Sequence, residues 1–266
     1  YNDLLGAFAP NGEDWCYYSF PNGKRVHTTY WRCCKSSGAM ALEELSAVAY
    51  ARNGNDLCVN LLGPGHATLA LESAGRVRLE QITNYPFDGR VKLRIHPERA
   101  ASFGVRIRIP SWADRVDATI NGASIPGVSA GEFLTLNREW HAGDELTLNL
   151  PMQPRIHRRA SQSVQESRAP DGEPITQEVM HYDYLALTYG PLVFATTLID
   201  GYKIAETLLM SGESLDQAVE VVSPQSGPEL RLRSQGREPL TFTPYFATGG
   251  RQDGAWRLTW MQVSWT

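Results

Sequence analysis

The sequence has no long apolar run and no excess of basic residues, and these two absences argue against a membrane or a nucleic acid as the binding partner. No run approaches the roughly 20 apolar residues that a membrane-spanning helix needs. The 266 residues include 25 lysines and arginines against 29 aspartates and glutamates, so the formal net charge at pH 7 is −4. Binders of nucleic acid and of anionic membranes usually present a basic face. We therefore expect a soluble protein that has neither nucleic acid nor a membrane as its partner.

Cysteine is scarce as well, and the first residues do not have the pattern of a leader. Four cysteines are too few for a disulfide scaffold of this length, and two of them are adjacent, where a mutual bridge would strain the intervening peptide. We interpret them as thiols. The first residues, from Tyr1 to Leu5, contain no initiator methionine, no charged leader and no apolar signal core. We therefore expect the chain to begin inside a fold.

The apolar fraction of 42% and the aromatic fraction of 10% are those of a globular protein, and the pattern is mainly β. Helical spacing is clear only over Ala39–Arg52, where Ser36 or Ser37 could cap the first turn. From Leu57 onward, apolar residues alternate with polar ones between Gly, Pro, Asn and Asp, as in Val91–Ile95. Further β signals are Val105–Ile109, the Asn121-Gly122 hairpin turn, Leu146–Leu150, Tyr184–Leu187, Leu192–Ala195, Val219–Val222 and Trp256–Trp265. Turn signals at this spacing favour sandwiches over βαβ units.

The apolar pattern fades between Arg158 and Glu178, where Ser, Gln, Glu, Pro and Asp dominate. Such a composition is typical of a linker or of a long exposed loop. The sequence therefore predicts two β units, separated at about residues 158–178.

The unusual chemical feature is the adjacent pair Cys33-Cys34, directly before the predicted helix. A helix N-terminus and nearby basic side chains favour thiolates, which bind zinc and act as nucleophiles. The alternative is that two small residues fill a tight corner, and Cys58 has the pattern of a buried strand residue. Zinc prefers four ligands, and the nearest further candidates are Cys16, His27 and Glu43, none at a standard spacing. A redox role is disfavoured, because the chain has no C-x-x-C motif and no βαβ pattern.

Several segments in one order resemble glycoside hydrolase family 127, the β-L-arabinofuranosidases. The resemblance runs from Tyr1-Asn2 through Trp31-x-Cys33-Cys34, a helix that ends Ala49-Tyr50-Ala51, and Leu57–Leu61, and it spans about residues 1–200. The later segments are Gln81–Gly89, which looks like T-x-Y-P-W-D-G, Arg108–Trp112, which looks like R-I-P-x-W, Asn121-Gly122, Arg138–Asp144, and Tyr189–Phe194, which looks like R-G-P-L-V-Y.

The resemblance implies a retaining glycosidase with a zinc-bound cysteine nucleophile. In that family an (α/α)6 barrel holds the active site and β-sandwiches follow it. By resemblance, Cys33 is the catalytic nucleophile and a zinc ligand, and Cys34 is a second zinc ligand. The family's acid/base glutamate, and its remaining ligands, a glutamate and a further cysteine, correspond to sequence upstream of this chain. Lys35–Gly38 differs from the family's usual continuation after the pair, so the sugar specificity stays open.

The combined prediction is a mainly β chain: the end of an (α/α)6 barrel followed by two jelly-roll-like β-sandwich units. The predicted divisions are 1–56 for the barrel, 57–157 for the first sandwich, 158–178 for the linker or loop, and 179–266 for the second sandwich. We expect the catalytic domain to be incomplete here, so that the chain alone neither hydrolyses a glycoside nor holds zinc tightly. The alternative function is a non-catalytic carbohydrate-binding or assembly module.

The expected partners are an L-arabinofuranosyl-containing oligosaccharide or glycan and the missing N-terminal helical barrel, and a homodimer stays open. The expected cofactor of the intact enzyme is zinc. Free thiols favour a reducing, cytoplasmic compartment, whereas a periplasmic one stays open because zinc would also protect the thiols.

Overall fold

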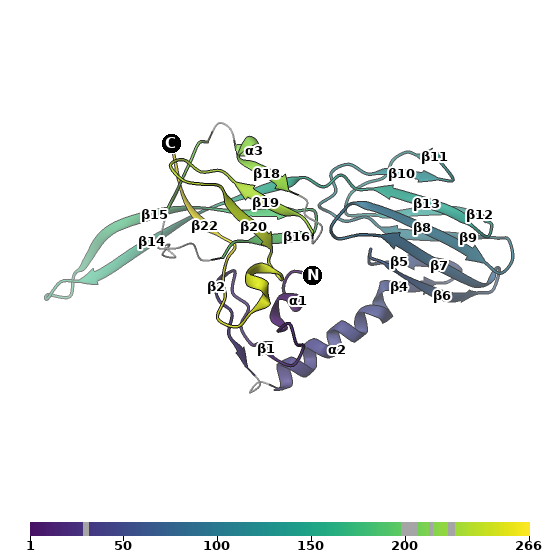
Figure 1. Ribbon diagram of the computed structural model, residues 1–266, viewed down its shortest axis with the longest axis horizontal. Helices are drawn as coiled ribbons and strands as arrows, with labels where there is room; N and C mark the ends of the chain where they lie inside the picture. Colours follow the sequence, from purple (N-terminus) through teal and green to yellow (C-terminus); the bar gives the residue numbers. More distant parts are fainter. Residues whose placement is uncertain (29–31, 198–206, 213–214, 223–226) are drawn as a thin grey trace. The chain divides into compact units, whose positions relative to one another are not determined.

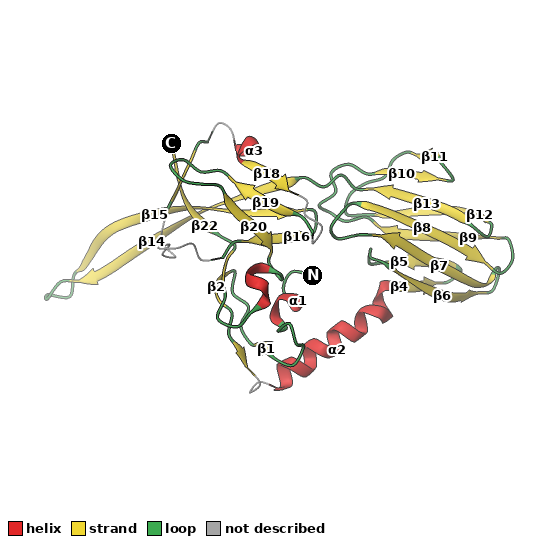
Figure 2. Cartoon of the chain, in the orientation of Figure 1, coloured by secondary structure: helices red, strands yellow, loops and turns green. Residues whose placement is uncertain are grey.

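The computed structural model describes residues 1–28, 32–197, 207–212, 215–222 and 227–266, and these are mainly β, as the sequence predicted (Figure 2). They form two compact units. We call Cys33–Gln153 the middle unit, and Tyr1–Arg32 together with Pro154–Thr266 the composite unit.

Helix α2 (Arg32–Ala49) leads into the middle unit (Figure 1). The sequence predicted its start at Ala39, but the helix begins seven residues earlier and places Ser36 and Ser37 inside it. It ends at Ala49, where Asn60 donates from its side chain to the carbonyl of Val48 at 3.0 Å and from its backbone to that of Ala49 at 2.9 Å. Asn60 thus binds carbonyls that the last turn leaves unpaired.

Two antiparallel-rich sheets make the middle unit. One has the order β11 (Ala123–Ile125), β10 (Asp117–Ile120), β13 (Asp144–Asn149), β8 (Arg90–Pro97), β7 (Gly75–Thr83) and β6 (Gly65–Leu71). The other has the order β12 (Phe133–Trp140), β9 (Ala101–Arg108), β5 (Asp56–Val59) and β4 (Tyr50–Asn53). Strand β5 pairs parallel to β9, and the other pairs are antiparallel.

The core of the middle unit consists of the apolar residues that alternate along these strands. Val91, Leu93 and Ile95 are buried, whereas the basic residues between them are partly exposed, as period-two patterning predicts. Trp140 is fully buried and donates from its indole nitrogen to the carbonyl of Phe103 at 3.0 Å. The predicted hairpin turn is confirmed, since Asn121 and Gly122 have φ values of 50° and 84° between β10 and β11.

The main sheet of the composite unit has the order β17 (Leu208–Met210), β22 (Met261–Trp265), β15 (Pro174–Tyr189), β16 (Leu192–Ala195), β20 (Leu240–Pro244), β19 (Glu229–Leu232) and β18 (Val219–Val222). Strand β14 (Pro154–Arg168) pairs with β15. Shorter elements are α1 (Leu4–Ala7), β1 (Trp15–Cys16), β2 (Asn22–Lys24), β3 (His27–Thr28), α3 (Leu215–Ala218), the 3-10 helix η1 (Thr248–Arg251) and β21 (Trp256–Leu258).

The prediction of a linker or loop at 158–178 is wrong. These residues form most of the β14–β15 hairpin, whose far half extends as a two-stranded arm in Figure 1. The residues from Arg158 to Gln162 are all exposed, so no buried face imposes an alternating apolar pattern on this stretch. Polar strands of this kind cannot be distinguished from a loop by periodicity.

The N-terminal segment also differs from its predicted place in a helical barrel over 1–56. The described residues 1–28 form the short elements α1, β1, β2 and β3, and strand β2 pairs with β21 near the C-terminus. Residues 1–32 therefore belong to the composite unit, and α2 is the only long helix among the described residues.

Candidate functional site

The two adjacent cysteines lie in the first turn of α2. The Cys33 thiol is exposed and that of Cys34 is partly exposed, and their Sγ atoms are 3.8 Å apart. Consecutive helical residues point about 100° apart, so two neighbouring thiols approach each other in this way only with suitable side-chain rotamers. The alternative interpretation, in which both cysteines are small residues packed in a tight corner, does not fit the exposure of Cys33.

The electrostatics of the pair differ from the sequence-based expectation. Desolvation raises the pKa of the Cys34 thiol, and the hydrogen bond and charge interaction with Cys33 raise it further. This direction is opposite to the lowering that the helix N-terminus and basic neighbours were expected to cause. A group of opposite charge close to the sulfur would be needed to hold this thiol deprotonated at neutral pH.

The spacing of the two sulfurs can be compared with that of zinc ligands. Two thiolates at the usual Zn–S distance of about 2.3 Å in a tetrahedral site are roughly 3.8 Å apart. The observed separation of 3.8 Å therefore fits two of the four ligands of one zinc ion.

The other candidate ligands do not complete the site. Cys16 and His27 are paired across β1 and β3 in the composite unit, while Glu43 is exposed on α2. Within the described ranges, no three or more His, Cys, Asp and Glu side chains come together in a group that could hold a metal ion. Burial raises the pKa of the Cys16 thiol, although the charges of Arg25 and Arg257 oppose this effect.

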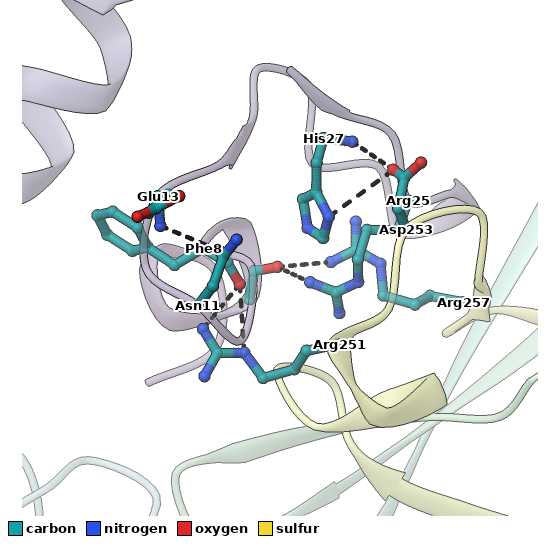
Figure 3. Close-up of polar contacts among 9 residues, drawn as sticks. Phe8, Asn11, Glu13, Arg25, His27, Arg251, Asp253 and Arg257 are labelled. Atoms are coloured by element: carbon teal, nitrogen blue, oxygen red, sulfur yellow. Dashed lines mark hydrogen bonds and ion pairs between the residues drawn. The ribbon is translucent and has the colours of Figure 1, made fainter. Parts of the chain in front are cut away.

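Sequence reasoning missed a cluster of arginines around the end of α1 (Figure 3). Arg25 and Arg257 are almost fully buried, and both donate to the carbonyl of Gly6. Arg251 donates to the carbonyl of Phe8 at 2.7 and 3.2 Å. The three guanidinium groups thus bind carbonyls at the C-terminal end of α1, where the helix dipole is negative.

The environment of these arginines is costly for a cation. Burial, followed by the charge of Arg257, lowers the pKa of Arg25 to about 10. Arg257 lies over the ring of Tyr245 at 4.4 Å, which supplies a favourable cation–π contact. The cluster joins segments far apart in the sequence, and no local motif could have predicted it. It is structural, since it fixes the N-terminal segment to the C-terminal strands.

The family model described as "Beta-L-arabinofuranosidase, GH127 middle domain" matches residues 56–152. No curated protein sequence matches the chain. No helix in the described ranges has both the length and the apolar character of a membrane span.

Solved structures have the same fold over nearly the whole chain. A glycoside hydrolase is 20% identical with a TM-score of 0.72, and 98% of this chain covers 46% of that one. A GH127 β-L-arabinofuranosidase from Geobacillus stearothermophilus T6 is 20% identical with a TM-score of 0.71, and the coverage is 98% and 44%. A GH127 β-arabinofuranosidase is 18% identical with a TM-score of 0.76, again with coverage of 98% and 44%.

At these identities the structural likeness establishes the fold, and the chain spans less than half the length of each of these structures. The family match adds the sequence evidence, and it covers both sheets of the middle unit except strand β4. The resemblance found in the motifs is thereby confirmed: residues 56–152 match the model of the GH127 middle domain, and the chain has the fold of GH127 structures.

Proposed function

We propose that this chain is the C-terminal part of a retaining glycoside hydrolase that releases β-L-arabinofuranosyl residues, with Cys33 as its nucleophile. The observation that supports this most is the exposed thiol pair at the start of α2, the helix that leads directly into the GH127 middle domain. The chemistry requires an accessible sulfur, and Cys33 is the more exposed of the two.

The proposed reaction has two displacements at the anomeric carbon. In the first, the Cys33 thiolate forms a C–S bond while the C–O bond to the leaving group breaks, and a carboxylic acid protonates the departing oxygen. In the second, the same carboxylate takes a proton from water, whose oxygen displaces the sulfur and restores the thiolate. Two inversions give net retention. We assign the acid/base carboxylate to a glutamate of an N-terminal helical barrel.

Zinc is the proposed cofactor, with Cys33 and Cys34 as two of its ligands. When bound, zinc would favour deprotonation of both thiols at neutral pH. The 3.8 Å separation of the sulfurs supports this assignment. The remaining ligands are assigned to the helical barrel.

The exposed face of α2 supports a helical partner. Gly38 is its only buried residue among those described, whereas Met40, Leu45 and Val48 are 59%, 46% and 53% exposed. An apolar helix face of this kind is usually buried against another element. Packing of the N-terminal barrel against this face would cover these side chains and bring its carboxylate to Cys33.

The test is hydrolysis of an aryl β-L-arabinofuranoside by the full-length enzyme carrying Cys33→Ser. Serine is a far weaker nucleophile, so we expect turnover to fall by about a thousandfold or more. Ser37→Ala, on the next turn of the same helix, is the matched control and should leave turnover unchanged. Near-normal turnover of the Cys33→Ser enzyme would exclude Cys33 as the nucleophile.

The cofactor assignment has a separate test in the 266-residue chain. With only two of the four ligands assigned to it, this chain should lose zinc to a mild chelator and should hydrolyse no arabinofuranoside. One equivalent of zinc retained after dialysis against the chelator would contradict the assignment of the remaining ligands to the barrel.

A further inference from the structure

The composite unit contains a cavity of about 400 Å³ that the proposed reaction does not use. This volume lies within the usual range for small-molecule sites. Apolar surfaces of Pro21, Val193, Tyr245 and Trp260 form much of its wall. The polar residues of the lining are Asn2, Asp3, Ser19, His157, Thr188 and Thr259.

The Thr259 hydroxyl lacks a protein partner, whereas Ser19, the other buried hydroxyl of the lining, interacts with the side chain of Tyr245. The residue is only 5% exposed, and its Oγ1 atom forms no hydrogen bond with any described residue. A buried hydroxyl without a partner costs free energy, and rotation of the Thr259 side chain toward the hollow that this residue lines would let a ligand hydroxyl satisfy it. His157 and Thr188 differ, since their side chains already bond each other at 2.9 Å and present a joined polar edge.

A second hollow of about 350 Å³ shares Pro21 and Trp260 with the first. Its other lining residues are Asn22, Arg159, Ser161 and Tyr184. Trp260 therefore borders both hollows, and a ligand longer than one ring could contact the indole from each of them. Two neighbouring hollows with a shared aromatic side chain suit a chain of small rings.

The walls are held in place before any ligand arrives. The Asn22 side chain accepts hydrogen bonds from the backbone of Thr259 at 2.9 Å and of Trp260 at 2.8 Å, and it donates to the Trp260 carbonyl at 2.6 Å. Tyr245 donates from its hydroxyl to the carbonyl of Phe20 at 2.8 Å. This preorganisation lowers the entropy that binding would otherwise cost.

The lining favours an uncharged ligand that has both apolar faces and hydroxyl groups. Asp3 disfavours an anion in the first hollow, and Arg159 disfavours a cation in the second. A purely apolar ligand would leave the Thr259 hydroxyl without a partner. A sugar ring meets these requirements, because its C–H face packs on an aromatic ring and its hydroxyls both donate and accept.

We propose that the two hollows around Trp260 form an accessory binding site for two consecutive neutral sugar residues of an oligosaccharide. The choice of an arabinofuranosyl oligosaccharide rests on the proposed function, whereas the choice of a neutral sugar rests on the lining alone. The Trp260 indole is the stacking surface, and the Thr259 hydroxyl bonds one ring hydroxyl in the first hollow.

The experiment titrates the 266-residue chain with a β-L-arabinofuranosyl disaccharide and follows the Trp260 indole N–H signal by NMR. We expect a saturable shift of this signal. Trp260→Ala should weaken binding, measured by calorimetry, by about tenfold or more, because it removes the apolar surface shared by both hollows. Trp265→Ala is the matched control: Trp265 lies on the adjoining strand, packs against Arg158 and lines neither hollow.

The hydroxyl has its own matched pair of variants. Thr259→Val keeps the shape and removes the hydroxyl, and it should weaken binding by about fivefold to tenfold, whereas Thr259→Ser should retain most of the affinity. Equal affinity of the Val and Ser variants would contradict the assigned hydrogen bond.

The outcomes separate this site from the proposed reaction. The absence of a Trp260 shift with the disaccharide would overturn the site, whatever Cys33→Ser does to hydrolysis. Saturable binding at Trp260 together with an active Cys33→Ser enzyme would support the site and overturn the proposed nucleophile. Equally tight binding of a glucose disaccharide would overturn the arabinofuranosyl preference.

Discussion

The replacement Asp144→Asn tests whether the Asp144 carboxylate stabilises the middle unit by joining the turn at Asn121 to the turn at His141. Asp144 Oδ1 accepts a hydrogen bond from the Asn121 amide at 2.8 Å, and Oδ2 accepts one from the backbone N–H of His141 at 3.0 Å. Asn121 in turn accepts from the backbone of Glu145 at 2.9 Å. One carboxylate therefore joins two turns, and its side chain is only 10% exposed.

The magnitude follows from the lost interactions. Asparagine retains one acceptor oxygen and turns an NH2 group toward a donor, so one charge-assisted hydrogen bond is lost and one donor is left unpaired. We expect the free energy of unfolding of the middle unit to fall by about 2 kcal/mol at pH 7. Asp117→Asn on β10 removes the same charge from an exposed position and should change stability by less than about 0.5 kcal/mol.

The effect should depend on pH with a defined sign. Burial alone would raise the pKa of Asp144, but the bonds from His141 and Asn121 and the charge of Arg138 outweigh it and lower this pKa. Acidification therefore protonates Asp144 of the unfolded chain first. The stabilisation is complete above about pH 3.9, the ordinary pKa of aspartate, and is lost as the pH falls further through the folded-state pKa.

The assay is hydrogen exchange at the amides of β8 and β13, which reports the opening free energy of this unit. The difference between wild type and Asp144→Asn should be largest at neutral pH and should shrink as the pH falls below about 3.9. A constant difference across this range, or a variant as stable as wild type at pH 7, would refute the reasoning.

The remaining predictions concern the close packing of Gly89 against Leu150 and the arginine cluster around α1. Gly89→Ala should destabilise the middle unit by about 2–3 kcal/mol in urea denaturation, because the added Cβ would overlap the carbonyl oxygen of Leu150. Gly212→Ala is the control, since no described atom lies within 4 Å of the Cβ that it would add. Arg251→Ala removes the hydrogen bonds to the Phe8 carbonyl, so it should destabilise the composite unit by about 1–3 kcal/mol and speed proteolysis of the N-terminal segment. An unchanged rate of cleavage would contradict the anchoring role of Arg251.

Sequence predicted those parts of the fold in which each strand buries one face. Leu146, Leu148 and Leu150 alternate in the sequence and are all buried, since polar residues between them face away from the core. The Asn121-Gly122 turn was predictable for a local reason, because few other pairs adopt two positive φ values. These features depend on neighbouring residues alone.

The errors arose where long-range packing overrides local pattern. The start of α2 was set too late, because its first turn contains cysteines and serines of weak helix propensity. The β14–β15 arm was taken for a loop because both of its faces are polar and exposed near Arg158 and Ser161. The arginine cluster and the cavity beside Trp260 join segments more than 200 residues apart, and no sequence spacing indicates them.

Of the candidate site, the sequence supplied Cys33 and Cys34 through their resemblance to a family motif, and the structure adds the 3.8 Å sulfur separation. The expected direction of the Cys34 pKa was wrong, because desolvation and the adjacent Cys33 thiol raise this pKa. The acid/base carboxylate and the remaining zinc ligands are proposed to lie in the helical barrel, outside residues 1–266.

The most direct measurement of the central claim is the mass of the Cys33 peptide during turnover. The full-length enzyme would be mixed with an aryl β-L-arabinofuranoside, quenched with acid within one turnover and digested. We predict that the peptide containing Cys33 gains the mass of one anhydro-arabinose, and that the adduct is absent in Cys33→Ser. Sustained hydrolysis with an unmodified Cys33 peptide, or an adduct on another residue, would contradict the account.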